Sequence, residues 1–268
     1  MDELVAIAEP VGRAGGVVMS HLRSEDDDKI EASLDELLEQ CERSGARAHV
    51  SHIKSVLGHG RARADALLAK LARGRERGLE ITADIYPYTA SYTTLGILFP
   101  DFARPPHDYA DARAKRHDDL AKSLRATVER RNGPEATVFG DGTHAGHTLA
   151  EVAKAEAIPF EEVLARMGPN GGSAAYFVMD DELQSALLED PFVMIGTDGG
   201  GGRHPRGFGT FARVIEEYVE KRHALSIEEA IRKMTSLPAH TLRLDGTIGC
   251  IDAGCAADLV VFSPAEIH

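Results

Sequence analysis

The sequence carries few positive charges for its length. Its 268 residues include 30 Lys and Arg against 43 Asp and Glu, which gives a formal net charge of −13. A surface of this sign repels phosphate backbones, so the composition argues against a nucleic-acid-binding protein. No apolar run approaches the roughly 20 residues that span a bilayer, and the first residues show no signal-peptide pattern. We therefore expect neither nucleic acid nor membrane as a partner.

Cysteine is also scarce. Cys41, Cys250 and Cys255 make no CxxC pair and indicate no disulfide framework. Such cysteines suit a reducing compartment, so the sequence predicts a cytoplasmic protein. The hydrophobic fraction of 43% is large enough for a sizeable buried core.

Strand and helix patterns alternate along the first third of the chain. "VVMSH" is typical of a buried strand ending at His21, and "ARAHVSH" of a second ending at His52. Apolar residues at helical spacing lie between them, from Ile30 to Cys41. A further helix around Leu67 leads to a third strand, "LEITADIY", which ends at Tyr86. The 31-residue step from His21 to His52 is one βα unit, and successive βα units predict a parallel sheet.

The alternation is looser after Tyr86. We expect helices over 112–131, 148–167 (broken at Pro159), 209–222 and 227–236, and strands at "ATVFGDG" and "FVMIGTD". Ser226 and Glu229 form a capping-box pattern at the start of the last helix. The tail, "GTIGCIDAGCAADLVVF", is glycine-rich and then strand-like, which is typical of a piece of a small β domain.

Chemically active residues fall at the strand ends. In parallel α/β folds, ligands bind at the carboxyl ends of the strands, which here carry His21, His52, Tyr86 and Asp198. Two imidazoles and a carboxylate suit zinc, which accepts N and O ligands at about 2 Å. A single strand-end histidine is also common as a hydrogen-bonded structural residue. Two of them one βα period apart, with a strand-end Asp, favour the metal site.

A resemblance extends through nearly the whole chain. The segments "MSHLRSE", "VSHIK", "ADIYPYTAS", "IGTDG", "HPRGFGTFARV" and "AIRKMTSLPA", in this order, resemble the N-acyl-D-amino-acid deacylases (D-aminoacylases) of the amidohydrolase superfamily. The closing "IGCIDAGCAADLVVFSP" is similar to the usual C-terminal segment of that superfamily. The resemblance implies a zinc-dependent hydrolase that releases a carboxylate and a D-amino acid from an N-acyl-D-amino acid, with one or two ions.

The resemblance also implies roles for particular residues. His21 and His52 match metal-ligand histidines on barrel strands five and six, and Asp198 matches the strand-eight aspartate that is both metal ligand and general base. Tyr86 matches a substrate-contacting tyrosine. His204 and Arg206 are candidates to bind the substrate carboxylate, although a structural loop role fits them equally well. Arg23 and Glu25 are candidates to support the site, with a surface ion pair as the alternative.

One part of the family pattern is missing. The family's first barrel strand carries an H-x-H pair for the metal, and no H-x-H occurs in this sequence. "THAGH", with His144 and His147, has the wrong spacing. The expected fold is therefore the C-terminal half of a metal-dependent (β/α)8 TIM-like barrel over residues 1–240, strands five to eight, followed by a fragment of a small β domain over 241–268. The chain is expected to need the missing N-terminal half or self-association.

Three hypotheses remain at this point. The chain is part of an active deacylase, or it is a catalytically inactive truncated fragment, or it is an unrelated α/β module with structural histidines. The number and order of the matching motifs disfavour the third hypothesis.

Overall fold

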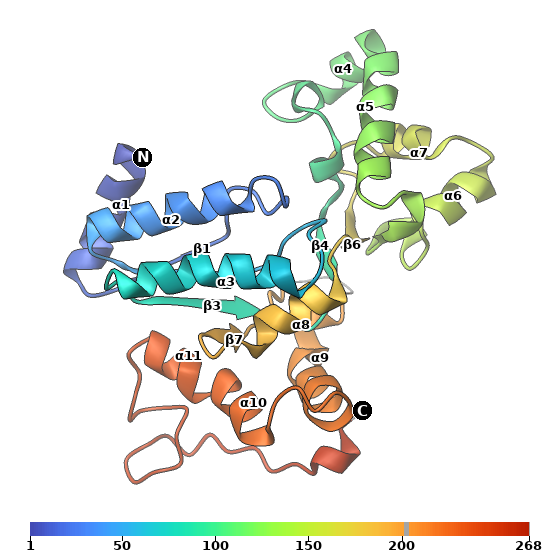
Figure 1. The fold of residues 1–268 in the computed structure, drawn as a ribbon. Helices are drawn as coiled ribbons and strands as arrows, with labels where there is room; N and C mark the ends of the chain where they lie inside the picture. The colour runs from blue at the N-terminus through green and yellow to red at the C-terminus, as the bar shows by residue number, and fades with distance from the viewer. Residues whose placement is uncertain (201–203, 268) are drawn as a thin grey trace. The chain divides into compact units, whose positions relative to one another are not determined.

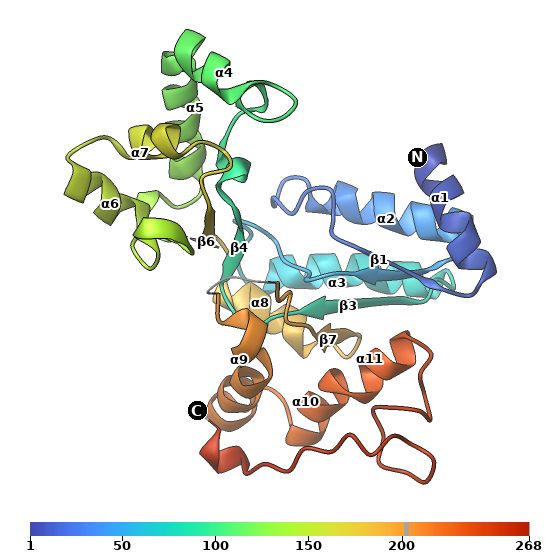
Figure 2. The ribbon, with the colours of Figure 1, turned by 180° about the vertical axis from the view of Figure 1, so that it is seen from behind.

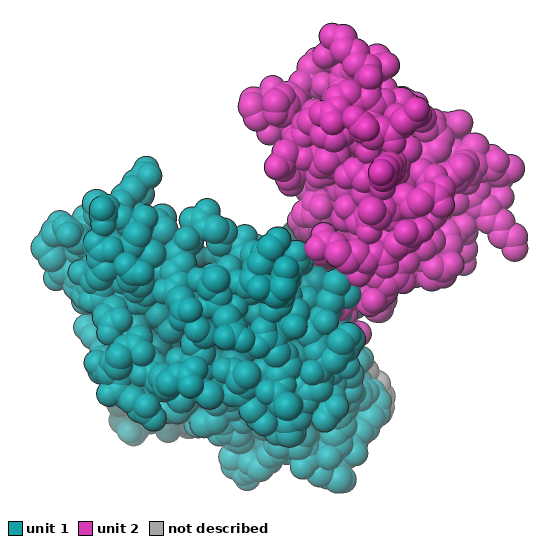
Figure 3. Space-filling model, turned by 45° about the horizontal axis from the view of Figure 1, so that its top comes forward, with its two compact units in different colours: residues 1–88, 179–200, 205–268 teal, residues 89–178, 201–204 magenta. Residues whose placement is uncertain are grey.

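The computed structural model describes residues 1–200 and 204–267, and the chain divides into two compact units. The larger unit comprises Met1–Tyr88, Met179–Gly200 and Pro205–His268, and the smaller comprises Thr89–Val178 and Gly201–His204. Figure 3 colours the two units separately. Because the smaller unit is inserted after the third strand of the larger one, the alternation of strand and helix is interrupted there.

The larger unit contains a four-stranded parallel sheet in the order β1-β2-β3-β7. Its strands are β1 (Val17–Ser20), β2 (Arg47–Val50), β3 (Ile81–Ile85) and β7 (Val193–Ile195). The register aligns Ser20 with Val50 and Ala83 with Val193, so all four carboxyl ends lie at one edge of the sheet. The predicted parallel α/β sheet is confirmed.

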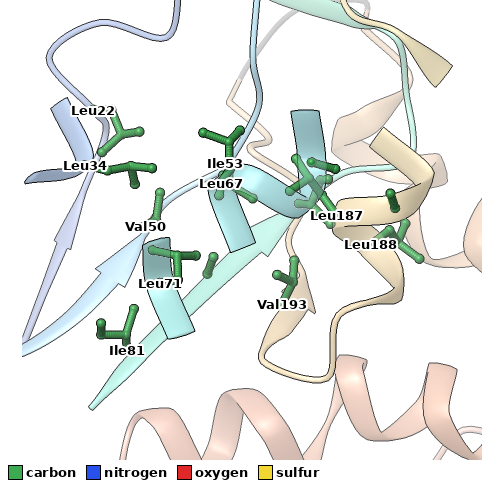
Figure 4. Packing of buried hydrophobic residues seen from close by; sticks show 14 of the residues in the cluster. Leu22, Leu34, Val50, Ile53, Leu67, Leu71, Ile81, Leu187, Leu188 and Val193 are labelled. Atoms are coloured by element: carbon green, nitrogen blue, oxygen red, sulfur yellow. The ribbon is translucent and has the colours of Figure 1, made fainter. Parts of the chain in front are cut away.

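Helices cover one face of this sheet (Figures 1 and 2). The helices of the larger unit are α1 (Asp2–Arg13), α2 (Ile30–Ser44), α3 (Arg61–Glu76), α8 (Asp181–Glu189), α9 (Arg206–Arg213), the π-helix η5 (Val214–Lys221), α10 (Ile227–Met234), α11 (Ser236–Thr241) and the 3-10 turn η6 (Pro264–Glu266). The core forms where α2, α3 and α8 pack on the strands. Figure 4 shows Leu71 and Leu187 beside Val50 and Val193.

The other face of the sheet is bordered by two cavities rather than by a leucine-rich layer. A cavity of about 640 Å³ lies along the beginnings of the strands and a second of about 500 Å³ along their ends, and both are bordered by α11. Met19, on this face, is 54% exposed. This face therefore carries the space in which a ligand can bind.

The smaller unit is an antiparallel sheet with four helices. Its strands are β4 (Ala90–Thr94), β5 (Thr137–Phe139) and β6 (Ser173–Phe177), in the order β4-β6-β5. Its helices are α4 (Tyr109–Lys115), α5 (His117–Arg130), α6 (Leu149–Glu156) and α7 (Phe160–Met167), with 3-10 turns η1 (Leu95–Leu98), η2 (Asp101–Ala103), η3 (Pro134–Ala136) and η4 (Gly142–His144). The expected break at Pro159 is confirmed, because this proline is the N-cap of α7. The strands β4 and β6 were not expected from the sequence.

Two sequence expectations concern the C-terminal segment. Cys250 and Cys255 form a disulfide with their Cα atoms 6.2 Å apart, so the expectation of no disulfide is wrong for this pair. Cys41 is free and buried. No strand is present among the described residues of 241–267, and the division at residue 240 into a barrel and a small β domain stays a prediction.

Among the described residues, no helix is long and apolar enough to cross a membrane. A cytoplasmic location stays a prediction, and the disulfide removes the cysteine argument for it.

Candidate metal centre

Two histidines meet at the carboxyl edge of the parallel sheet. His21 directly follows β1 and His52 lies two residues beyond β2, and the register of the two strands brings their rings together. His21 Nδ1 lies 3.1 Å from His52 Nε2. Two nitrogens bound to one tetrahedral zinc at about 2.0–2.1 Å stand roughly 3.3 Å apart. The separation of the two imidazoles therefore fits a shared metal ion.

Glu25 completes a three-residue cluster. The ligand atoms of His21, Glu25 and His52 all lie within 4.8 Å of one another. Glu25 Oε1 is 3.1 Å from His52 Nδ1 and 3.6 Å from His21 Nδ1. It thus faces the nitrogen of His52 that points away from His21. A carboxylate in that position orients a metal-bound imidazole through its second nitrogen, which suits the supporting role expected for Glu25.

Lys54 is buried behind the same cluster. Its Nζ lies 2.6 Å from Glu25 Oε1 and 2.6 Å from His52 Nδ1, and it donates to His52 O at 2.9 Å. Burial lowers the pKa of Lys54. For Glu25, burial acts to raise the pKa, but the hydrogen bond with His52 and the charge of Lys54 outweigh it, so the pKa is lowered and the carboxylate stays ionised. The sequence pattern "SHIK" contains Lys54 but does not indicate this ion pair.

His21 is kept in the form that binds metals. Partial burial lowers its pKa from the ordinary value of 6.5, and this outweighs the negative charge of Glu25, which acts to raise the pKa. The ring is therefore neutral at pH 7 and retains a nitrogen lone pair, which a metal ligand requires.

Asp198 borders the same 500 Å³ cavity as both histidines. It follows β7 by three residues, and its Oδ2 forms an ion pair with Arg206 Nη1 at 2.8 Å. Asp198 has a φ of 44° and His52 a φ of 40°. The left-handed region is unfavourable for residues other than glycine, and such conformations cluster at functional sites where the surroundings enforce them.

Tyr86 and Arg206 lie together beside Asp198. The guanidinium carbon of Arg206 is 4.8 Å from the centre of the Tyr86 ring, and both side chains are buried. Burial raises the pKa of Tyr86, so its phenol is protonated at neutral pH. A buried phenol and a guanidinium are both hydrogen-bond donors for an anionic group.

The other two predicted site residues lie elsewhere in the structure. His204 is part of the smaller unit, where its Nε2 is 3.1 Å from Ala90 O and its ring packs edge-on against Tyr92. Arg23 Nε forms an ion pair at 2.9 Å with Glu36 on α2, and 66% of its side chain is exposed. The geometry of Arg23 fits the surface-pair alternative that the sequence left open.

Asp84 and His49 are at the site but were not among the predicted site residues, although Asp84 lies within the segment "ADIYPYTAS". Asp84, on β3, accepts a hydrogen bond from the backbone N–H of His52 at 3.0 Å, and its Oδ2 lies 2.8 Å from His49 Nε2. Asp84 and Thr82 alternate with buried apolar residues along β3. Polar residues at every second position of a buried strand indicate that one face of the sheet borders a functional site, so this pattern could have revealed Asp84.

Comparisons with known proteins identify what the chain is similar to. The pattern of the Amidohydrolase family matches residues 181–267. The N-acyl-D-glutamate deacylase of Alcaligenes xylosoxydans xylosoxydans is 33% identical over 263 residues, which cover 97% of this chain and 48% of that protein. A crystal structure of N-acyl-D-glutamate deacylase from Bordetella bronchiseptica, complexed with zinc and a phosphonate inhibitor, is similar with a TM-score of 0.79 and 28% identity, over 99% of this chain and 50% of that one. A structure of D-aminoacylase with a binuclear metal centre is similar over 98% of this chain and 49% of that one, with a TM-score of 0.74 and 26% identity.

The fold, the cluster of His21, Glu25 and His52 and these matches together make the chain similar to α/β proteins of the amidohydrolase type. Within that class, the resemblance to the N-acyl-D-amino-acid deacylases is confirmed. The chain spans about half the length of the curated relatives it matches, in agreement with the expectation that it holds half of such a fold.

Proposed function

We propose that this chain supplies a zinc site and the proton-transfer carboxylate for hydrolysis of the amide bond of N-acyl-D-amino acids. The 3.1 Å approach of His21 Nδ1 to His52 Nε2, with Glu25 behind His52 and Asp198 on the same cavity, carries the proposal. Zinc, when bound, polarises the acyl carbonyl and makes water a stronger nucleophile at neutral pH.

The protein's own groups divide the remaining work. His21 and His52 hold the ion, Glu25 orients His52, and Lys54 keeps Glu25 ionised. Asp198 takes a proton from the attacking water and later delivers it to the leaving amine. Asp198 would also serve as a further metal ligand, since it borders the same cavity as His21 and His52.

Tyr86 and Arg206 bind the substrate carboxylate in this scheme. Arg206 is buried and carries a planar guanidinium that binds carboxylates with two N–H groups, and Tyr86 contacts it. In the structure Arg206 pairs with Asp198, so it also fixes the direction of that carboxylate. His204 stays a candidate for substrate contact.

The chain matches only about half the length of its relatives, and this affects whether it can hydrolyse a substrate by itself. A hydrolytic zinc site needs a fixed coordination geometry and ordered support, and the sequence lacks the family's H-x-H pair. We infer that this chain alone is inactive and that a complementary half of the barrel completes the site.

Zinc titration by calorimetry tests the metal site. Wild type is expected to bind zinc weakly, and His52→Ala to lower the affinity at least 10-fold because one of two imidazole ligands is lost. His117→Ala is the matched control, since His117 lies on α5 of the smaller unit beside Glu162. Equal zinc uptake by wild type and a His21→Ala/His52→Ala double variant that keeps its fold would reject the site.

A complementation assay tests the reaction. The chain is mixed with the half of the N-acyl-D-glutamate deacylase that it does not cover, and amine release from N-acetyl-D-amino acids is followed. Activity is expected in the mixture and not with Asp198→Asn. Hydrolysis by the chain alone, abolished by Asp198→Asn, would show that a second copy completes the site.

A further inference from the structure

We propose that Asp84 is a positioning residue that holds His52 in its metal-binding conformation, with His49 fixing Asp84 in turn. The inference rests on the proposed function, because it takes His52 as a metal ligand. Asp84 lies on β3 and is joined to the end of β2 by the hydrogen bonds of both its side chain and its backbone.

The backbone at His52 depends on Asp84. Asp84 Oδ1 accepts from His52 N at 3.0 Å, and Asp84 O accepts from the next amide, Ile53 N, at 2.8 Å. A single residue thus binds two consecutive amides where the chain leaves the sheet. His52 has a φ of 40°, which is unfavourable for a residue with a Cβ, so external contacts must stabilise it.

His49 orients the Asp84 carboxylate. It is only 1% exposed, with Nε2 2.8 Å from Asp84 Oδ2 and Nδ1 2.8 Å from Thr82 Oγ1. Because a carboxylate only accepts, the partners assign the hydrogen to Nε2, and the Thr82 hydroxyl then donates to Nδ1. This chain of bonds directs the other carboxylate oxygen, Oδ1, at the His52 amide.

The neighbouring strand leaves room for the carboxylate. A Cβ at Gly196, directly after β7, would lie 2.4 Å from Asp84 Oδ1. Gly196 N donates to Ile85 O at 3.0 Å, so the strand end stays paired beside the carboxylate. Asp84 therefore contacts the exits of both β2 and β7, which lead to His52 and Asp198.

Amide hydrogen exchange of His52, followed by NMR on the metal-free full chain, tests the positioning directly. Asp84→Ala is expected to speed exchange of that amide at least 10-fold, because its acceptor is lost. Asp84→Asn keeps a carbonyl oxygen for the amide and is expected to stay near wild type. Asp141→Ala is the matched control, since Asp141 likewise accepts from a backbone amide, Ser173 N, but in the smaller unit.

Zinc affinity provides the second measurement. Asp84→Ala is expected to weaken zinc binding 10- to 100-fold, the usual cost of losing an outer support of a metal ligand, with Asp84→Asn restoring most of it. Unchanged His52 exchange in a folded Asp84→Ala, or equal zinc affinity of that variant and wild type, would overturn the positioning role. Absence of zinc binding in wild type would instead reject the metal site, while the exchange experiment still decides the role of Asp84.

Discussion

The two faces of the parallel sheet are built from the same strands but from different kinds of residue. In β3, Ile81, Ala83 and Ile85 point into the helix-covered core, whereas Thr82 and Asp84 border the cavities on the other face. In β2, Ala48 and Val50 face the core, whereas His49 borders the 500 Å³ cavity. In β2 and β3, one face thus supplies stability through apolar burial, whereas the other carries polar groups that could act on a ligand.

We call the face of the sheet that carries His49, Thr82 and Asp84 the polar face. The largest expected effect concerns whether another chain covers this face. The sheet has two edge strands, β1 and β7. In β7, Val193 N already donates to Asp190 O and Val193 O accepts from Lys233 Nζ, so we expect pairing at β1, where Met19 is 54% exposed. We expect the chain to self-associate at micromolar concentration in the absence of a complementary half. Sedimentation velocity measures this directly, with Met19→Glu expected to shift the population toward monomer.

Phe208→Glu is the control for that measurement, because Phe208 is 79% exposed but lies on α9 and not on the sheet. A monodisperse wild-type monomer that melts cooperatively would show that the polar face and the sheet edges are stable without a covering partner.

The covered face is tested by truncating its side chains. Leu67 on α3 is fully buried in the core cluster, so Leu67→Ala is expected to lower the free energy of unfolding by about 2–5 kcal/mol. Met19→Ala removes an exposed side chain from the other face and, at concentrations low enough for the chain to be monomeric, is expected to change the free energy of unfolding by less than about 0.5 kcal/mol. Denaturant unfolding of the two variants compares the faces. If Met19→Ala and Leu67→Ala lose equal amounts of unfolding free energy, Met19 is buried in solution by another copy.

The difference between the faces also explains what the sequence could predict. The βα period was readable because each strand carries a short apolar run and each helix an apolar stripe, both local patterns. His21, His52 and Asp198 were found because they stand at strand ends within recognisable motifs. Asp84 and His49 were missed because their role depends on side-by-side strand register, and the interacting residues are 35 positions apart.

The smaller unit was harder to predict for the same reason. Strand β4 pairs with β6, and Tyr92 opposes Ala175 across a long stretch of intervening chain. β4 is rich in Ser and Thr and β6 in Ser and Ala, so their hydrophobic patterns are weak. The Cys250–Cys255 bond likewise depends on the loop conformation, which two cysteines five residues apart do not determine.

The smallest expected effect comes from a single methyl group beside Asp84. Gly196→Ala places a Cβ 2.4 Å from Asp84 Oδ1, so the carboxylate must move away from the His52 amide. We expect a loss of about 1–3 kcal/mol in unfolding free energy, together with weaker zinc binding. Gly207→Ala is the matched control, because Gly207 lies in α9 with its nearest contact at 3.8 Å, and alanine there is expected to be neutral or stabilising by up to about 1 kcal/mol. If Gly196→Ala leaves both the stability and the zinc affinity unchanged, Asp84 has room to shift without releasing His52, and the polar face tolerates more movement than its hydrogen bonds indicate.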